Sequence, residues 1–445
     1  MKRYSEYKDS GVKWIGEIPE HWKIEPFGRH FSYGKGLPIT KADLVSEGVA
    51  VISYGQIHSK LNIGTTMDDC LLRYVDPKYI ETNPQCLLNK NDFVFADTSE
   101  DIEGCGNFAF NDRNESIFAG YHTIIVRPID ILHPKYYAYL FQSKKWKSQV
   151  QTLVNGVKVF SISRGILKKA SLLIPTYTEQ QEIVTYLDTK VANIDEYISI
   201  AEKKIAALEE LKQSIIAEAV TRGIHKEVPM KDSGVKWIGM IPEHWKIMRL
   251  RFVCEFRNGY TPSKANPKFW ENGTIPWFRM EDIRDSGRFL NEAKQYISKE
   301  AVKGDGLFEA GSFILATTAT IGEHAMLIAD SLANQRFTNL KIRKSLISKL
   351  SRNFFFYYLF VIDEYCKSTT RKATFPSVDM TDLKNIGVSI PPIEEQQEIV
   401  TYLDSKVANI NQLCQAERSQ IEKLKEYKQR LISDVVTGKV KVTND

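Results

Sequence analysis

Two long stretches of the chain carry apolar residues at alternating spacings of three and four, the heptad pattern of helices that pack on another helix. In the first stretch this seam contains Val191, Ile194, Ile198, Ala201, Ile205, Leu208 and Ile215. In the second stretch it contains Leu403, Val407, Ile410, Cys414, Ile421, Leu424 and Leu431. Each stretch follows an Ile-Pro pair, and proline is common where a helix begins. The pattern predicts two long amphipathic helices.

One lysine in each seam indicates how these helices pair. Lys212 and Lys428 stand where the next apolar residue is due. In a parallel pair in register the two lysines would face each other, whereas antiparallel packing places them at opposite ends. The segment 179–219 would be about 60 Å long if wholly helical. We therefore expect an antiparallel two-helix coiled coil with a pseudo-two-fold axis across its middle; the alternative is that each helix packs only on its own domain.

Two sequence boxes occur twice, almost letter for letter. EQQEIVTYLDTKVANI at 179–194 returns with one change at 395–410, where each copy opens one of the long helices. KDSGVKWIGEIPEHWKI at 8–24 returns with one change at 231–247. The chain therefore consists of a duplicated frame. In each half of the frame the KDSGVKWIG box comes first, a variable segment follows, and the EQQEIV box comes last.

The segments between the boxes, 25–173 and 248–389, differ from each other. A duplication followed by drift alone would blur boxes and inserts alike, so we infer two equivalent frame halves that carry two different recognition domains. The β-rich runs in these inserts are 49–57, 92–98, 122–128, 273–283, 311–318 and 338–344, and the helical runs are 134–150 and 351–367. Each insert is expected to form one compact α+β domain.

The expected fold class is therefore α+β, with two recognition domains separated by two long antiparallel coiled-coil helices and a pseudo-two-fold internal repeat. The expected boundaries are 1–174 for the first box and domain, 175–224 for the first helix, 225–390 for the repeated box and second domain, and 391–445 for the second helix and tail. The apolar residues of the boxes are expected to tie each domain to the helix ends; they are Trp14, Ile15, Ile18, Trp22, Trp237, Ile238, Ile241 and Trp245.

Polar residues stand where the predicted strands give way to loops. Arg, Lys, Gln and Asn side chains read base edges, and Ser or Thr often hold phosphates, so these residues are candidates for DNA binding. In the first insert they are Gln56, His58, Lys60, Thr98, Ser99, Tyr121, His122, Lys158, Ser161 and Arg164. In the second they are Thr261, Ser263, Lys264, Arg279, Arg284, Thr317, Thr318, Gln335, Arg336, Arg371, Lys372 and Ser377. The alternative is a solvated polar rim with no ligand.

Composition narrows the class of protein further. The formal net charge of +5 favours anionic partners only slightly. The six cysteines are scattered without a CxxC pair, so no zinc or redox motif is indicated. No apolar run approaches the about 20 residues of a membrane span, and the N-terminal residues do not form a signal peptide, so we expect a cytoplasmic protein. A phosphate-binding P-loop, a metalloprotease HExxH and a GxSxG nucleophile motif are absent from the sequence.

Taken together, the motifs resemble those of the specificity subunit of type I restriction–modification systems. The resemblance covers essentially the whole chain and rests on SGVKWIGEIPEHWKI, its copy SGVKWIGMIPEHWKI, and the EQQEIV helix openings. It extends to NGYTPSKANPKFWENGTIPWFRMEDI at 258–283, which is similar to the opening of that family's recognition domains. The first insert keeps only Gly36 and Pro38 of this opening.

The resemblance implies a non-catalytic DNA-recognition subunit that binds double-stranded DNA. Each recognition domain would read one half of a split asymmetric target, and the helices would set the gap. Two methyltransferase subunits would use S-adenosylmethionine to methylate adenine, and restriction subunits would use ATP and Mg²⁺. No cofactor or metal is expected on this chain itself. Two other classes stay open: a coiled-coil scaffold whose inserts bind protein, and an enzyme such as a fused methyltransferase, against which the missing Asn/Asp-Pro-Pro-aromatic tetrapeptide counts.

Overall fold

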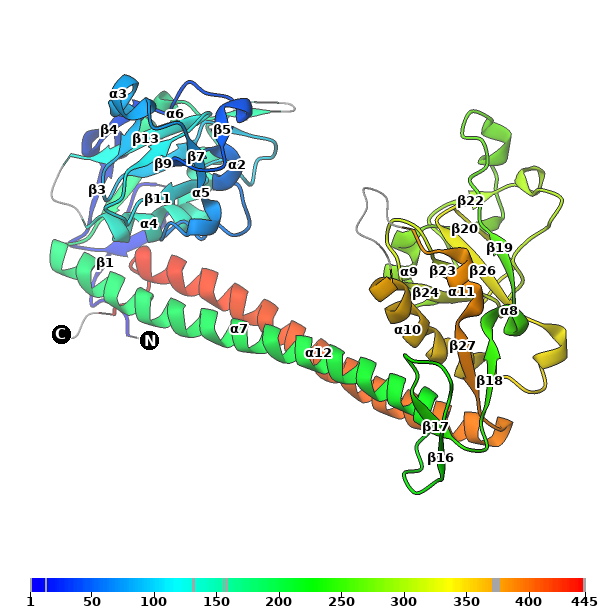
Figure 1. The fold of residues 1–445 in the computed structure, drawn as a ribbon. Coiled ribbons are helices and arrows are strands. Elements are labelled where there is room, and N and C mark those ends of the chain that lie inside the picture. The colour runs from blue at the N-terminus through cyan, green and yellow to red at the C-terminus, as the bar shows by residue number, and fades with distance from the viewer. Residues whose placement is uncertain are drawn as a thin grey trace. The chain divides into compact units, whose positions relative to one another are not determined.

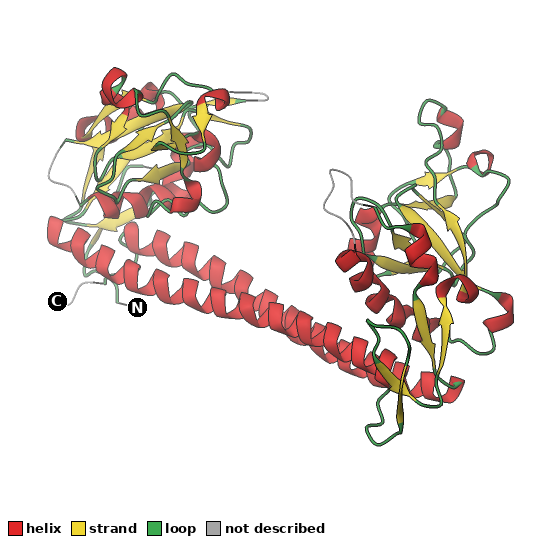
Figure 2. Cartoon of the chain, viewed as in Figure 1, coloured by secondary structure: helices red, strands yellow, loops and turns green. Residues whose placement is uncertain are grey.

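The computed structural model describes residues 2–12, 14–129, 133–154, 156, 159–369 and 377–442. The chain forms two compact units: the first contains Met1–Ala201 and Ser419–Asp445, and the second contains Glu202–Arg418. Helices α7 (Tyr177–Arg222) and α12 (Ile393–Val436), labelled in Figure 1, each belong partly to the first unit and partly to the second. Strands, shorter helices and connecting loops make up the rest of both units (Figure 2). Within the described ranges, no helix combines the length and apolarity needed to cross a membrane.

The first unit is built on two sheets. The four-stranded antiparallel sheet has the order β11 (Phe108–Phe110), β9 (Phe93–Ala96), β13 (Thr123–Pro128) and β4 (Phe31–Lys35). The five-stranded sheet has the order β5 (Leu44–Val45), β7 (Arg73–Val75), β6 (Val49–Ile52), β12 (Ile117–Ala119) and β8 (Leu87–Leu88), with β6 and β12 parallel.

Both faces of β9 are buried, which explains why its sequence FVFA is continuously apolar. Phe93 and Phe95 pack into an aromatic core with Phe141 and Trp146, while Val94 and Ala96 pack into the core that contains residues of the five-stranded sheet. Helices α4 (Pro134–Gln142) and α5 (Lys144–Gln151) supply Phe141 and Trp146. The alternation follows from the two-residue period of a strand.

The second unit repeats the central part of this strand order with different residues. Its main sheet has the order β19 (Cys254–Asn258), β26 (Phe337–Ile342), β23 (Phe313–Ala316), β24 (His324–Leu327) and β21 (Phe289–Leu290). Its second sheet has the order β22 (Tyr296–Ile297), β20 (Ile275–Phe278) and β25 (Leu332–Ala333), with β20 and β25 parallel. Helix α10 (Arg352–Thr369) packs its aromatic residues into the core of this unit. Both inserts are α+β domains, and their main sheets share an order of four strands, β4-β13-β9-β11 and β19-β26-β23-β24.

Three of the predicted elements are wrong in part. The strand predicted over 49–57 ends at Ile52, because a capping box between Ser53 and Gln56 starts helix α2 (Tyr54–Ile57). The strand predicted over 273–283 likewise ends at Phe278, and helix α9 (Met280–Ser286) follows. The helix predicted over 134–150 is two helices, because Ser143 leaves the helical conformation and its hydroxyl accepts from the amide of Trp146.

The two long helices run antiparallel within each unit. In the first unit the ammonium of Lys428 bonds Asp195 at 2.7 Å, and in the second the ammonium of Lys212 bonds Asn411 at 3.1 Å. Each seam lysine therefore has a polar acceptor on the opposite helix instead of another lysine. The apolar residues of both seams are buried or half-buried, and those at the helix ends belong to the cores of the two units.

Each repeated box forms a hairpin followed by a strand that closes the base of its insert. The hairpins are β1 (Tyr7–Asp9) with β2 (Glu17–Pro19), and β16 (Met230–Asp232) with β17 (Met240–Pro242). The next strands are β3 (Lys23–Pro26), which pairs with β15 (Ser171–Ile174), and β18 (Lys246–Arg249), which pairs with β27 (Gly387–Ile390). The first and last strands of each insert are thus hydrogen-bonded neighbours.

Candidate nucleic-acid interface

The two units share a backbone arrangement at the ends of their central strands, although the sequences differ there. The amide of Asp97 donates to the carbonyl of His122 at 3.1 Å, and the amide of Thr317 donates to the carbonyl of Arg336 at 3.0 Å. The carbonyls of Asp97 and Thr317 also accept equivalent bonds, of 2.8 Å and 2.9 Å, from a later segment of each insert. Asp97 is therefore the structural equivalent of Thr317, and His122 is the equivalent of Arg336.

Neighbouring positions agree with this alignment. Thr98 of β10 (Thr98–Ser99) pairs with Ser161 of β14 (Phe160–Ser161), and Thr318 forms a β-bridge with Ser377. Helices α2 and α9 both begin with a capping box, which aligns the ends of these two helices. The predicted residues that fall at equivalent positions are His58 and Arg284, Thr98 and Thr318, Tyr121 and Gln335, His122 and Arg336, and Ser161 and Ser377.

The structure also aligns the two insert openings. The amide of Gly36 donates to Thr123, and the amide of Gly259 donates to Phe337, the residue after Arg336. A Cβ atom on either glycine would lie within 2.2 Å of a backbone carbonyl oxygen, at Gly120 and Asn334 respectively, so only glycine fits. Gly36 is thus the equivalent of Gly259, and the opening motif recognisable in the second insert has a counterpart in the first.

Two adjoining hollows mark this region of the first unit. One, of about 630 Å³, is lined in part by Tyr54, His58 and His122; the other, of about 660 Å³, is lined in part by Tyr121, His122 and Arg164. The ring of Tyr54 contacts the rings of His122, Tyr121 and His58, with centroids 5.4, 5.6 and 6.3 Å apart. Such an aromatic cluster offers apolar edges to a bound base, with imidazole and guanidinium groups around it.

His122 lies at the border of both hollows and has a left-handed backbone, with φ of 55°. Its Nδ1 lies 3.2 Å from the carboxylate of Asp97, which fixes the direction of the ring. The strained backbone and this hydrogen bond hold an exposed imidazole in one orientation, as a recognition residue requires.

In the second unit the equivalent region carries longer cationic and amide side chains. The hydroxyl of Thr261 donates to the side-chain oxygen of Gln335, so the amide nitrogen of Gln335 remains available as a donor. Arg284 pairs with Glu323 at 3.4 Å, while its side chain stays 60% exposed. Arg336 is exposed as well. These side chains suit hydrogen bonding to base edges or phosphates.

Several predicted residues have their polar groups engaged inside their own unit. The side chain of Gln56 caps Ser53, and the hydroxyl of buried Ser99 donates to the carbonyl of Asp101. The hydroxyl of Thr317, also buried, bonds Thr338 at 3.0 Å. The amide of Arg279 bonds Asp282, and its guanidinium pairs with Glu281.

Lys60, Ser263 and Lys264 are exposed on loops. Lys158, Arg371 and Lys372 lie outside the described residues. The sequence reading missed Tyr54, which contacts three of the candidate rings, and Asp97, which immediately follows a strand and stands next to the selected Thr98. In the part of the chain that is described, no group of three or more His, Cys, Asp or Glu could hold a metal ion.

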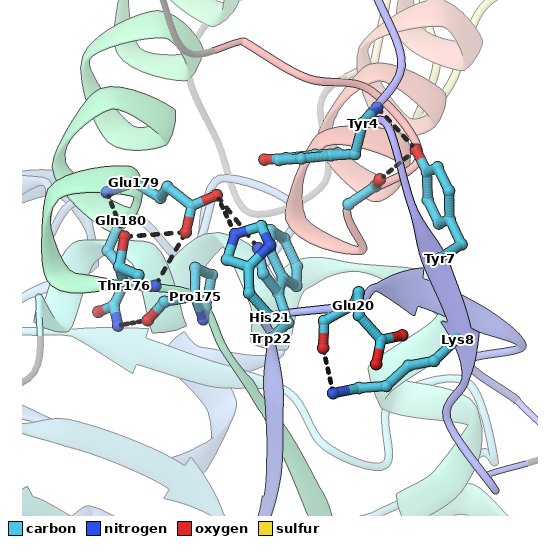
Figure 3. Close-up of polar contacts among 11 residues, drawn as sticks. Tyr4, Tyr7, Lys8, Glu20, His21, Trp22, Pro175, Thr176, Glu179 and Gln180 are labelled. Atoms are coloured by element: carbon cyan, nitrogen blue, oxygen red, sulfur yellow. Dashed lines mark hydrogen bonds and ion pairs between the residues drawn. The ribbon is translucent and has the colours of Figure 1, made fainter. Parts of the chain in front are cut away.

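The repeated boxes contact the helix ends. Figure 3 shows this for the first copy, where His21 and Trp22 lie beside Glu179 at the start of α7. In the first copy, buried Trp22 donates its indole N–H to Glu179 at 3.3 Å, and His21 contacts the same carboxylate at 2.9 Å. Thr176 also donates to Glu179, through its amide at 3.0 Å and its hydroxyl at 2.8 Å. Burial raises the pKa of Glu179, but the hydrogen bonds from His21, Thr176 and Trp22 outweigh it and lower that pKa overall.

The second copy repeats the tryptophan and histidine contacts, whereas Pro392 stands at the position of Thr176 and has no N–H or hydroxyl to donate. Trp245 and His244 approach Glu395 at 3.1 and 2.8 Å. Of the eight apolar box residues, Trp14 and Trp237 are half-buried and the other six are buried. The expectation that these residues tie each insert to the helix ends is confirmed.

Comparisons with known proteins agree with this architecture. A family model described as type I restriction modification DNA specificity domain matches residues 33–210 and 242–423. A type I restriction enzyme EcoprrI specificity subunit from Escherichia coli is 46% identical over 159 residues, which span 34% of this chain and 40% of that subunit. A putative type I restriction enzyme MjaX specificity subunit from Methanocaldococcus jannaschii is 24% identical over 98% of both chains.

One solved structure shares the fold along most of the chain. It comes from work on complex assembly and conformational transition of the type I R-M system. The alignment has a TM-score of 0.68 at 18% identity and covers 94% of this chain and 98% of that one.

Proposed function

Because the chain belongs to the family of type I restriction–modification DNA specificity proteins, we propose that each of its two units reads one half of a bipartite DNA target. The observation that carries the proposal is that backbone hydrogen bonds place residues of the two units at equivalent positions. Where the frames agree, both have the Thr and Ser pair, Thr98 with Ser161 and Thr318 with Ser377. Short hydroxyl side chains at fixed positions suit phosphate contacts, which orient a protein on DNA without reading its sequence.

Where the frames differ, the side chains differ in what they can read. Tyr121 and His122 in the first unit correspond to Gln335 and Arg336 in the second. Arginine binds the O6 and N7 atoms of guanine, and glutamine binds the N6 and N7 atoms of adenine, so Arg336 and Gln335 favour purines in the second half-site. Tyr54 and the imidazoles favour contacts of shape and apolar edge in the first. The two half-sites are therefore expected to be unlike.

The long helices would act as the spacer between the two half-sites. Recognition elements that bind one face of B-DNA stand about one turn, ~34 Å, apart. Helices α7 and α12 pair through buried seams and two lysine contacts, so the length of helix between the inserts is defined by packing. We expect this length to set the unspecific gap of the target.

Methyltransferase subunits would dock on the repeated helix openings. The buried residues of the 179–194 and 395–410 boxes are explained by packing, but exposed residues of the boxes are repeated as well. The exposed residues identical in both copies include Gln181 and Gln397, Thr185 and Thr401, and Lys190 and Lys406. Identical exposed surfaces in two units fit two copies of one partner, which we take to be the adenine methyltransferase subunit. That subunit would bring S-adenosylmethionine, and restriction subunits that join the complex would bring ATP and Mg²⁺.

Methylome sequencing tests the proposal directly. Co-expression of the chain with its methyltransferase subunits in a host is expected to yield adenine methylation at one split asymmetric motif. The same host with the methyltransferase subunits but without this chain should show no methylation at such a motif. The proposal places this complex in the cytoplasm with its DNA.

Two further measurements exclude the other classes of function. A scaffold with no role on DNA would show no salt-dependent DNA binding by the complex, whereas counterion release predicts a steep loss of affinity with salt. If the chain were itself a methyltransferase, the purified chain would methylate DNA when incubated with a methyl donor. We expect no methylated DNA from that incubation.

A further inference from the structure

Two residues next to the candidate interface occupy equivalent positions in the two units. The carbonyl of Asn107 accepts from the amide of Ala96 at 3.1 Å, and the carbonyl of Glu323 accepts from the amide of Ala316 at 2.8 Å. Each immediately precedes a strand that pairs with β9 or β23, namely β11 in the first unit and β24 in the second. Neither residue belongs to the predicted interface, and their side chains differ in charge.

In the first unit Asn107 forms the centre of a chain of hydrogen bonds. The ammonium of Lys147 lies 2.6 Å from the amide oxygen of Asn107, the amide nitrogen lies 3.1 Å from Nδ1 of His58, and Nε2 of His58 lies 2.8 Å from the carbonyl of Thr98. An ammonium only donates, so the Asn107 oxygen must face Lys147 and its nitrogen must donate to Nδ1. His58 therefore carries its proton on Nε2 and donates it to Thr98.

The surroundings leave His58 little freedom. A Cβ atom at Gly104 would lie 3.1 Å from Cε1 of His58 and 2.3 Å from the hydroxyl of Ser99, so the backbone of this loop packs directly against the ring. Lys147 is half-buried, and burial lowers the pKa of its ammonium. Since both nitrogens of His58 are used internally, the residue contributes to the interface by its ring edge and by holding Thr98.

In the second unit the same two positions carry an ion pair. Arg284, the equivalent of His58, donates to Glu323, the equivalent of Asn107, at 3.4 Å. The side chain of Glu323 is 24% exposed and that of Arg284 is 60% exposed, so the carboxylate lies behind the guanidinium. One carboxylate occupies only part of the five-donor guanidinium fork of this largely exposed side chain, which leaves N–H groups for another acceptor.

We propose that Asn107 and Glu323 are positioning residues for DNA recognition, each of which orients the side chain at the end of the adjacent short helix, His58 or Arg284, toward its own half-site. The inference rests on the proposed function and adds to it two residues that act through a neighbouring side chain, His58 or Arg284. Changing either residue is then expected to relax one half-site and to leave the other intact, so each unit provides the matched control for the other.

Methylome sequencing of the complex with its methyltransferase subunits measures this. Asn107→Leu keeps the approximate volume but removes both side-chain hydrogen bonds. We expect about tenfold weaker discrimination at one or more base pairs of the first half-site, with an unchanged second half-site. Glu323→Leu should give the reverse pattern. An unchanged motif in both variants, or an equal loss in both halves, would overturn the proposal.

An exchange of the pair separates positioning from a merely structural role. His58→Arg alone places a guanidinium without its carboxylate in the first unit, and Asn107→Glu alone removes the donor to His58. Both single variants are expected to show a relaxed first half-site. The double variant H58R/N107E rebuilds the pair of the second unit, so we expect a sharp first half-site again, with at least one altered base.

A double variant as relaxed as the single variants would count against positioning. If Asn107→Leu gives no methylation at all, Glu323→Leu and the double variant decide the question. The proposed function itself fails only if the unaltered complex shows no bipartite motif. An unaltered complex with such a motif but insensitive variants would refute the positioning role alone.

Discussion

Trp22→Ala tests the anchor between the first insert and the helix ends. The indole is fully buried, its ring centroid lies 5.9 Å from that of Tyr4, and its N–H bonds Glu179. The backbone of Gly438 also packs on it, since a Cβ there would lie 3.2 Å from the indole and 2.4 Å from Pro19. The substitution therefore removes two contacts at once, one with Glu179 at the start of α7 and one with Gly438 just beyond the end of α12.

The expected destabilisation of the first unit is about 3–5 kcal/mol for truncating a buried Trp. Loss of the indole donor to Glu179 adds about 1 kcal/mol. This is a large part of the about 5–15 kcal/mol that stabilises a typical domain. Trp22→Phe keeps most of the ring and loses the donor, so it should cost about 1–2 kcal/mol and serves as the control.

Hydrogen exchange followed by mass spectrometry suits a chain of two units, for which a single two-state unfolding free energy is not defined. In Trp22→Ala we expect faster exchange in peptides covering 7–24 and 430–440, and unchanged protection in the second unit. Trp245→Ala, in the other copy of the box, should affect the second unit instead. The methylated motif should stay the same in both variants. Unchanged exchange in 430–440, or an altered first half-site without loss of protection, would refute the anchor.

Three further outcomes can be measured. The first is an insertion of four residues after Ala201, with a matched insertion after Arg418 in α12. It should lengthen the gap between the half-sites by ~6 Å, near two base pairs, and leave both half-sites unchanged. Footprints with altered half-sites would contradict the spacer role. Replacement of 25–173 by another insert should change only the first half-site, because β3 and β15 pair at the base of the module; a change in both halves would show that the units are not independent. Glu179→Gln should destabilise the first unit near neutral pH, because the folded pKa of Glu179 is lowered and its stabilisation is present above the unfolded pKa. The difference in stability between wild type and Glu179→Gln should shrink as pH falls through that lowered pKa; a difference that grew on acidification would contradict the assignment.

The sequence predicts the long helices well because a seam repeated over many turns is a strong local signal. The antiparallel direction also follows from local information, since one misplaced lysine per helix is enough to exclude the parallel pair. The strands over 49–57 and 273–283 are predicted too long because the capping residues that end them, Ser53 with Gln56 and Arg279 with Asp282, stand within otherwise apolar runs.

The candidate interface is only partly visible in the sequence. Residues that follow strands, such as Thr98 and His122, can be selected because strand ends are recognisable. Asn107 and Glu323 cannot, because their contacts join positions 49 and 39 residues apart and have different chemistry in the two units. The equivalence of the inserts rests on backbone hydrogen bonds that nearly unrelated side chains maintain, and a comparison of letters does not show them.

The contacts between the N-terminal and C-terminal residues of the first unit affect the order in which the two units can fold during synthesis. The hydroxyl of Tyr7 donates to the carbonyl of Gly438, across 431 residues, and Lys2 forms a β-bridge with Lys441. The second unit is one continuous segment, Glu202–Arg418, whereas the first also needs residues from Ser419 onward. On the ribosome the N-terminal unit can therefore close its frame only after the last turns of the chain have emerged, when the second unit is already complete. A premature stop near the C-terminus would accordingly damage the unit that was translated first.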